Sequence, residues 1–434
     1  MNLVNTLKRN PEDLLIAFVL VTVPFHAFLT VWLANIVGHY TLLRLWPEFV
    51  LLSLALWALY VLATDRALRQ RILGTRLAKL LIAFLGLTLL LGVIAYLREE
   101  VSTKALFYGI LLNVRFLVWF AVAWVAASRS DWLARHWQNI VFIPLAVVSV
   151  FAVLQFFILP PDFLGHFGYD AQTTIPPAQT INQDTHTIRA QSTLRGPNPL
   201  GAYLVIGIGL LAVSTMLIWK KLLLALASVV ALLVSFSRSA WLGLAATITA
   251  TSALLLNKKQ LTNLAIAATV SFVILVGLAF TFRNNGGVQN AVFHVDNTQT
   301  TAETTSDEGH LSAVRQSTSE VLHEPLGRGP GTAGPASVYN LAQPSRNSEN
   351  YFLNVGQELG WVGLGLFVWI LAEVLRALLA LRTGLARGLA ATFIGLVIIN
   401  MLSYAWADVT VAYLWWGLAG ITLGTTVHQK KTQR

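Results

Sequence analysis

The chain has 434 residues, of which 56% are hydrophobic and 12% are charged. This composition lies far from that of soluble proteins, so it excludes an ordinary soluble domain and indicates a chain whose helices face lipid. The net charge of +10 does not indicate nucleic-acid binding, because the basic residues are scattered through short connections and form no single patch. The lack of cysteine excludes disulfides and thiolate metal sites.

Twelve apolar runs of about the length that crosses a bilayer follow one another along the chain. The first is too long for a signal-peptide core, so we expect it to be a retained helix. The sequence therefore predicts an all-α, polytopic integral membrane protein, with residues 1–434 forming a single transmembrane domain of about twelve transmembrane helices. The runs lie near 13–36, 47–64, 78–97, 105–127, 139–159, 198–219, 222–237, 239–256, 261–281, 359–381, 388–405 and 408–426.

Lys and Arg gather in alternate connections between these runs, as in the cluster from Arg66 to Lys79. By the positive-inside rule, this bias predicts a protein of the cytoplasmic (inner) membrane with both termini in the cytoplasm. Two polar segments, 160–197 and 282–350, then form large loops on the outer face.

Within the second loop, apolar or small side chains recur at helical spacing, which predicts a short surface helix near 309–324.

Arg195 lies directly before the predicted span at 198–219, in Arg195-Gly196-Pro197-Asn198-Pro199. Proline at a first helical position and Asn198 as the cap suit a helix start, and such a start beside an arginine is an anion site. A plain helix cap with a snorkelling arginine is the alternative.

Arg238 lies at a tight turn between two apolar runs, among Ser235, Ser237 and Ser239. An arginine at a membrane boundary is costly unless it is paired, binds an anion or snorkels, and the serine donors favour a polar pocket. Arg115 lies near the centre of a predicted span, so it is expected to face a hydrated or anionic interior, with Asp408 as a candidate partner.

Arg315 lies on the predicted surface helix and is followed by Pro325-Leu326-Gly327-Arg328-Gly329-Pro330-Gly331. Glycine amides can approach an oxyanion closely, although such a stretch is more often only a turn. Glu349 ends the second loop, immediately before Asn350 and Tyr351, and is a candidate general base, with a helix-start charge as the alternative.

Histidines lack the spacing of metal ligands, and the chain has no Gly-x-Ser-x-Gly, so metal-dependent and serine hydrolysis are poor interpretations.

Five pieces follow in one order from Arg195 onward: RGPNPLG, SFSRSAW, PLGRGPG, NYFLNVGQELG and the Trp415-Trp416-Gly417 end. In these pieces and in their order the chain resembles the O-antigen ligase and polymerase superfamily. The resemblance implies a metal-independent, multi-spanning glycosyltransferase of the GT-C type that uses no cofactor. Such an enzyme moves a glycan from an undecaprenyl-pyrophosphate carrier to a lipid, protein or glycan acceptor outside the cytoplasmic membrane.

By this resemblance, Arg195, Arg238 and Arg315 look like the arginines that hold the pyrophosphate, and we expect them to converge on one outer-facing cavity. Many members carry His-Asn where this chain has Glu349-Asn350, and that histidine is the proposed base, so the glutamate departs from the pattern. Further candidates for substrate binding are Asn198, Arg115, Asn350 and Tyr351.

Two other classes fit a polytopic helical chain. One is a transporter of an anionic solute, in which Arg115 and Asp408 line the path. The other is a purely structural membrane protein, which the several outer-side arginines disfavour.

Overall fold

The computed structural model of the chain describes residues 10–181, 184–260 and 306–432, and the described chain is mostly helical. Its first part runs to the end of the fifth long apolar helix. The elements are α2 (Pro11–Thr22), η1 (Val23–Phe25), α3 (His26–Val37), α4 (Tyr40–Leu43), α5 (Trp46–Thr64), α6 (Arg66–Leu73), α7 (Arg76–Leu97), α8 (Thr103–Ala127) and α9 (Trp132–Phe157).

The second part contains the remaining helices and a small sheet. Its elements are η2 (Phe163–Phe167), β1 (Gln179–Ile181), β2 (Asp184–Arg189), α10 (Pro197–Ala212), α11 (Ile218–Val234), α12 (Arg238–Leu255), α15 (Ser306–His323), η4 (Gly334–Tyr339), α16 (Tyr351–Ala380), α17 (Gly384–Asn400), η5 (Ala405–Ala407) and α18 (Val409–Thr432).

Helices lie over eleven of the twelve predicted apolar runs, and the remaining run, 261–281, lies outside the described residues. By length and composition, six helical runs among the described residues can cross a membrane: Pro11–Val37, α5, α7, α8, α9 and α16. The protein is therefore a multi-pass helical membrane protein. This agrees with the predicted all-α class. Within the first polar segment, β1 and β2 add a small antiparallel pair in which Gln179 faces Arg189.

The first span is broken at η1, where Pro24 lacks the backbone N–H that would continue the helix. Side chains from distant segments satisfy the carbonyl groups that the break exposes. Thr193 Oγ1 donates to Pro24 O at 2.8 Å and Thr410 Oγ1 donates to Val23 O at 2.9 Å. These bonds hold the segments before α10 and at the start of α18 beside α3.

Helices α8 and α18 pack closely, because glycines of α18 let the two backbones approach. A Cβ on Gly420 would lie 2.4 Å from Phe120 O, and one on Gly424 would lie 2.4 Å from Trp124 O. Small residues at such a spacing are the usual means of close packing between membrane helices. Trp416 of α18 is fully buried against Phe116 and Phe120 of α8, and Trp415 is fully buried against α17.

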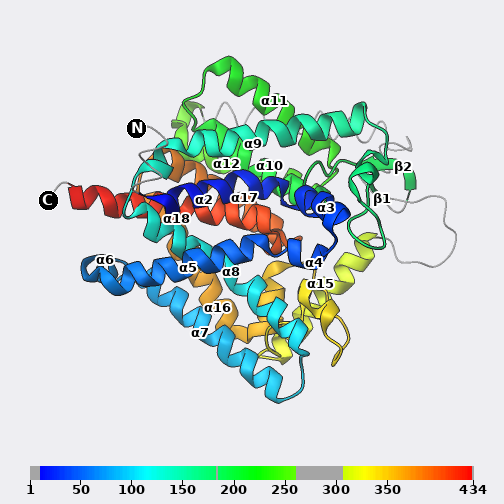
Figure 1. Ribbon diagram of the computed structural model, residues 1–434, viewed down its shortest axis with the longest axis horizontal. Coiled ribbons are helices and arrows are strands. Elements are labelled where there is room, and N and C mark those ends of the chain that lie inside the picture. The colour runs from blue at the N-terminus through cyan, green and yellow to red at the C-terminus, as the bar shows by residue number, and fades with distance from the viewer. Residues whose placement is uncertain (1–9, 182–183, 261–305, 433–434) are drawn as a thin grey trace.

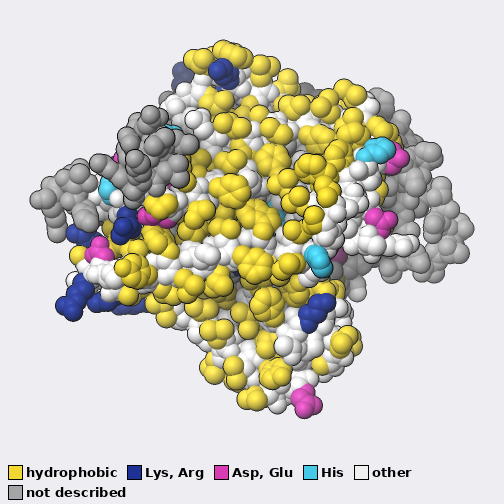
Figure 2. All heavy atoms as spheres, viewed as in Figure 1, with side chains coloured by type: hydrophobic (Ala, Val, Ile, Leu, Met, Phe, Trp, Pro, Cys, Tyr) yellow, Lys and Arg dark blue, Asp and Glu magenta, His cyan; other side chains and the backbone are white. Residues whose placement is uncertain are grey.

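The bundle has two chemically different ends along its long axis. The start of α2, the end of α18 and the basic helix α6 lie at one end, on the left of Figure 1. The hairpin of β1 and β2, α4 and α15 lie at the other end (Figure 1). Hydrophobic side chains cover the middle of the face in Figure 2, and Lys and Arg side chains gather where α6 lies.

Candidate functional site

A cavity of about 550 Å³ opens at the end of the bundle that carries α4 and α15. Its wall combines α3, α4, α5, α8, the start of α10, α15, the segment before α16 and the segment before α18. The hydrogen bonds at the η1 break hold two of these segments in place, the one before α10 and the one at the start of α18. The charged and titratable lining residues are His26, Tyr40, Arg44, Glu48, Tyr108, Arg115, Arg195, His310, Tyr339, Glu349, Tyr404 and Asp408.

Arg195 lies on this wall, exposed, immediately before α10. Pro197 occupies the first helical position, as predicted, but the N-cap is Gly196, so the assignment of Asn198 as the cap was wrong. Asn198 lines the cavity, and its Oδ1 accepts a hydrogen bond from Arg189 Nη2 at 2.8 Å. The side chain of Asn198 therefore binds a neighbouring arginine and does not cap α10.

Arg189, which the sequence analysis missed, ties the start of α10 to the Ser-Arg turn. Its Nε donates to Ser235 O at 3.0 Å. Burial, together with the neighbouring charge of Arg238, lowers the pKa of Arg189 to about 10. The guanidinium therefore stays charged at neutral pH. It joins the RGPNPLG piece, through Asn198, to the SFSRSAW piece, through Ser235.

Arg115 is buried on α8, as its central position predicts, but its partner is not Asp408. Arg115 Nη1 lies 2.8 Å from Glu48 Oε1 on α5, and Nη2 donates to Ala407 O. Asp408 lines the same cavity, and its Oδ1 accepts from Thr410 N at 2.9 Å at the start of α18. The carboxylate of Asp408 therefore caps the start of α18, and the ion pair of Arg115 is with Glu48.

Glu349 has a φ of 50°, in the left-handed region that a non-glycine residue rarely adopts. The hydroxyl of Tyr404 holds this backbone, because it accepts from Ser348 N and Glu349 N, both at 2.8 Å, and donates to Asn347 Oδ1 at 2.7 Å. Burial raises the pKa of Tyr404 to about 12, so the hydroxyl keeps its proton at neutral pH. Glu349 is thus fixed on the cavity wall, where His310 of α15 contacts its carboxylate.

Asn350 and Tyr351 serve the helix that follows Glu349. Asn350 Oδ1 caps α16 by accepting from Phe352 N at 2.9 Å and from Leu353 N at 3.0 Å. Tyr351 is 2% exposed and packs against Phe367 and Trp406. Both residues lie outside the lining of the cavity, behind the wall that Glu349 forms.

Arg238 and Arg315, both of which the structure describes, also lie outside this lining. Arg238 begins α12 beside Arg189, and Arg315 is exposed on α15. The cavity therefore gathers Arg195 of the predicted trio, together with Arg115 and with Arg44, which the sequence analysis missed.

The glycine-rich stretch before α16 uses its amides for packing. Arg328 N donates to Gln357 O at 3.0 Å, and Gly329 N donates to Glu358 O at 2.8 Å. Gly331 N donates to Oε1 of the buried Glu358 at 2.7 Å. These amides are therefore committed to α16, where Gly360 breaks the helix with a φ of 65°, and the turn interpretation holds.

Arg44, Glu48, His310 and Tyr404 are the lining residues that sequence reasoning missed. Arg44 and Glu48 had a signal, since both are charges at the edge of an apolar run, where a charge is costly without a partner. His310 and Tyr404 had none, because neither stands in a recognisable motif.

The described helices and this cavity define a multi-pass helical membrane protein with a site at one end of its bundle that is lined by three arginines and three carboxylates. Residues 222–368 match the family model described as O-antigen ligase, which confirms the resemblance inferred from the motifs. The match covers most of α11, all of α12 and α15 and the first part of α16, and thus includes Arg238, Arg315 and Glu349. The family implies a glycosyltransferase-type enzyme that acts on a lipid-linked glycan and an acceptor at the membrane. No curated protein matches the chain.

Proposed function

We propose that the protein transfers a glycan from an undecaprenyl-pyrophosphate carrier to an acceptor hydroxyl, and that the transfer takes place in the cavity described above. One observation carries this proposal: Arg44, Arg115 and Arg195 share one cavity with the carboxylate of Glu349. Cations that bind pyrophosphate and a basic group that faces the acceptor are the two requirements of such a transfer.

The three arginines differ in how they are held. Arg115 is paired with Glu48, which neutralises part of its charge. Arg44 and Arg195 have no carboxylate in ion-pair contact among the described residues, and Arg44 lies 5.6 Å from the centroid of the Tyr108 ring. The planar guanidinium binds two phosphate oxygens at once, so Arg44 and Arg195 are the proposed pyrophosphate ligands.

In the proposed reaction, the bond between the anomeric carbon and the pyrophosphate oxygen breaks, and its electron pair leaves with the pyrophosphate. Positive guanidinium groups stabilise the charge that develops there. The acceptor oxygen forms the new bond to the anomeric carbon and gives its proton to the carboxylate of Glu349, the proposed general base on the cavity wall. No step requires a metal ion.

Arg238 and Arg315 remain in the proposal, on the strength of their motifs alone, as cations for the donor. The proposed orientation places the cavity, the 160–197 loop and α15 at the outer face, with α6 and both termini in the cytoplasm. The full count of twelve spans belongs to this proposal, with the apolar run at 261–281 as one of them.

The test uses purified protein in lipid nanodiscs with an undecaprenyl-pyrophosphate-linked glycan and a hydroxyl-bearing acceptor, and measures glycan transfer and release of undecaprenyl pyrophosphate. Arg195→Lys and Arg44→Lys keep the positive charge but lose the planar guanidinium that binds two phosphate oxygens at once. We therefore expect kcat/KM for the donor to fall roughly tenfold or more. Arg238→Lys and Arg315→Lys are measured alongside.

Arg376→Lys is the matched control, because Arg376 is 68% exposed and pairs with Glu373 on the outside of α16. It should keep the wild-type rate. Equal rates for Arg44→Lys, Arg195→Lys and wild type contradict the assignment of the pyrophosphate site. A wild-type protein that releases no undecaprenyl pyrophosphate contradicts the function itself.

A further inference from the structure

We propose that a second cavity, between α15 and the segment before α16, binds a neutral sugar residue of the acceptor. This inference rests on the proposed function, and it selects a sugar hydroxyl among the lipid, protein and glycan acceptors that the function leaves open. The cavity has a volume of about 330 Å³, at the lower end of the range for small-molecule sites, so it suits a ligand of the size of a monosaccharide.

The lining of the second cavity has the composition that binds sugar hydroxyls. Among the described residues that line it, no side chain is both apolar and larger than that of alanine, which disfavours a lipid tail. Hydroxyl and amide side chains both donate and accept hydrogen bonds, as sugar hydroxyls do. Three serines and three amide side chains line the cavity: Ser312, Ser317, Ser345, Gln316, Asn347 and Gln357.

Two buried polar atoms on this wall have no hydrogen-bond partner among the described residues: Nη1 of Arg346 and Oε1 of Gln357. Both residues line the cavity, and they are 8% and 1% exposed. Their side chains meet at one oxygen, because Arg346 Nη2 and Gln357 Nε2 each donate to Glu320 Oε2 at 2.6 Å. Buried polar groups are normally paired, so a donor and an acceptor held near one another indicate a ligand with hydroxyl groups.

The charges around the second cavity favour a neutral ligand. Arg346 is the one cation on the described lining, and it pairs with Glu320 and, at 3.2 Å, with Glu324. A phosphate or a uronic acid would lie beside the carboxylate of Glu320, which also lines the cavity, so repulsion opposes an anion there. The cavity of the proposed reaction, in contrast, carries Arg44 and Arg195 for the pyrophosphate.

The position of the second cavity assigns its ligand to the acceptor. Asn347 lines both cavities, and Glu349, which follows closely in the chain, lines the cavity of the proposed reaction. A sugar in the second cavity therefore lies near the proposed general base. Because that base takes the proton of the acceptor hydroxyl, binding of the acceptor sugar at this place brings the two groups together.

Binding is measured by saturation-transfer NMR on the full-length protein in nanodiscs, with the methyl glycosides of glucose, galactose, mannose and N-acetylglucosamine as probes. At least one of these glycosides should bind. Methyl glucuronide and inorganic phosphate should not displace it, because Glu320 opposes a negative charge in the cavity. Absence of binding by every neutral glycoside overturns the proposal and leaves a cavity that holds only water.

Ala313→Leu places the bound glycoside. Ala313 lines the second cavity, so the larger side chain occupies the space of the ligand and removes no side-chain hydrogen bond, and binding should weaken roughly tenfold or more. Thr318→Leu is the matched control, because Thr318 is exposed on the same helix and lies outside the lining of both cavities. A glycoside that binds Ala313→Leu and wild type equally is bound elsewhere, which overturns the proposal.

Kinetics in the nanodisc assay test the acceptor role. The bound glycoside should inhibit transfer competitively against the acceptor and not against the donor. Arg346→Lys keeps the positive charge beside Glu320 but lacks Nη1, so acceptor KM should rise roughly tenfold, while donor KM stays unchanged and reports a folded site. Competition against the donor, or a rise in donor KM alone, overturns the assignment to the acceptor.

Failure of this proposal and failure of the proposed function give different results. A wild type that binds a neutral glycoside, with binding lost in Ala313→Leu, but transfers no glycan supports the sugar site and contradicts the proposed function. A wild type that transfers glycan, with unchanged acceptor KM in both Ala313→Leu and Arg346→Lys, overturns the sugar site and leaves the proposed function intact.

Discussion

At the scale of single residues, the hydroxyl of Tyr404 has a larger structural role than its position in the chain indicates. It accepts from the amides of Ser348 and Glu349 and donates to Asn347. These bonds compensate for the left-handed backbone of Glu349, which is unfavourable for a residue with a side chain. The position of the carboxylate on the cavity wall therefore depends on one hydroxyl of a different segment.

Tyr404→Phe tests this dependence. The ring remains, but two backbone amides lose their acceptor, each at a cost of roughly 1–3 kcal/mol if it stays unpaired. We expect kcat for glycan transfer to fall at least tenfold, because the loop relaxes and moves Glu349. The measurement is steady-state kinetics in nanodiscs.

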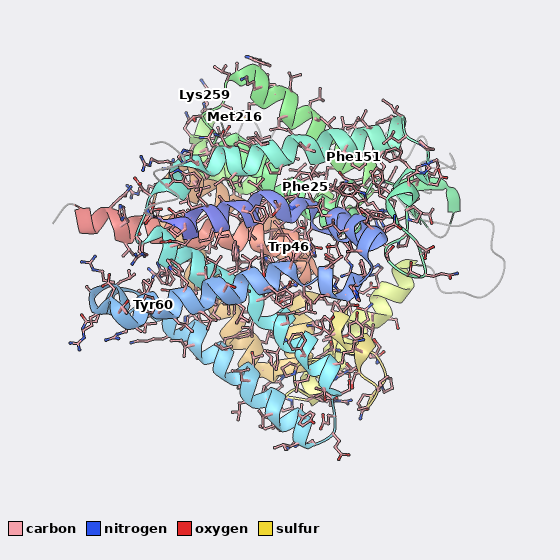
Figure 3. The ribbon with its side chains drawn as sticks, viewed as in Figure 1. Phe25, Trp46, Tyr60, Phe151, Met216 and Lys259 are labelled. Atoms are coloured by element: carbon pink, nitrogen blue, oxygen red, sulfur yellow. The ribbon has the colours of Figure 1, made fainter. Side chains whose placement is uncertain are left out.

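Tyr60→Phe is the control for the loss of a phenol, since Tyr60 lies on α5 away from the cavity lining and is 68% exposed (Figure 3). If Tyr404→Phe and Tyr60→Phe have equal rates, the hydroxyl does not position the site.

At the scale of elements, α15 is attached to α16 and to the loop before it by charges. Arg346 is 8% exposed, and its Nη2 lies 2.6 Å from Glu320 Oε2 and 3.2 Å from Glu324 Oε2. Gln357 of α16 donates to the same oxygen of Glu320. Because hydrogen bonds to charged groups are stronger than neutral ones, this cluster places α15, and with it His310, against the cavity.

The cluster predicts a pH dependence of stability. Burial acts to raise the pKa of Glu320, but hydrogen bonds from Arg346, Gln316 and Gln357 outweigh it and hold the pKa below its usual 4.5. A carboxyl whose pKa is lowered in the folded state stabilises the fold above its unfolded pKa, and this contribution is lost as the pH falls through the folded value. Glu320→Gln should therefore destabilise the protein by roughly 1.5–3 kcal/mol at neutral pH and less below the ordinary glutamate pKa.

Thermal unfolding midpoints of wild type and Glu320→Gln across this pH range check the prediction. Glu99→Gln is the control, because Glu99 is exposed after α7 and its carboxylate forms no ion pair with another described residue. A difference between Glu320→Gln and wild type that stays constant down to acidic pH contradicts the assigned role of the carboxylate.

At the scale of the whole molecule, the two ends of the bundle differ in charge and in content. The basic helix α6 and the end of α18 lie at the end opposite the cavity (Figure 1). Lys259, which follows α12, also lies on the α6 side of the view in Figure 3, whereas Phe151, near the end of α9, lies toward the hairpin. This arrangement agrees with the proposal that the cavity end faces outward.

The lack of cysteine makes this orientation directly testable, because each introduced thiol is the only one in the chain. Asp170→Cys and Leu341→Cys, both at exposed positions near the cavity end, should react with a membrane-impermeant maleimide in intact spheroplasts. Gln70→Cys on α6 should react only after the membrane is opened. The opposite labelling pattern contradicts the orientation and an outer-face reaction together.

The sequence by itself determined the class of protein, the location of most helices, the polar segments that build the site and the family of residues 222–368. These properties follow from hydropathy, proline and glycine positions and motif order, which are local in the chain. Only the tertiary structure decided which charges share the cavity. It paired Arg115 with Glu48 and not with Asp408, left Arg238 and Arg315 outside the lining, and brought His310 to Glu349. Such contacts join helices that are distant in sequence, so they depend on how the helices pack, and no local pattern encodes the distance between them.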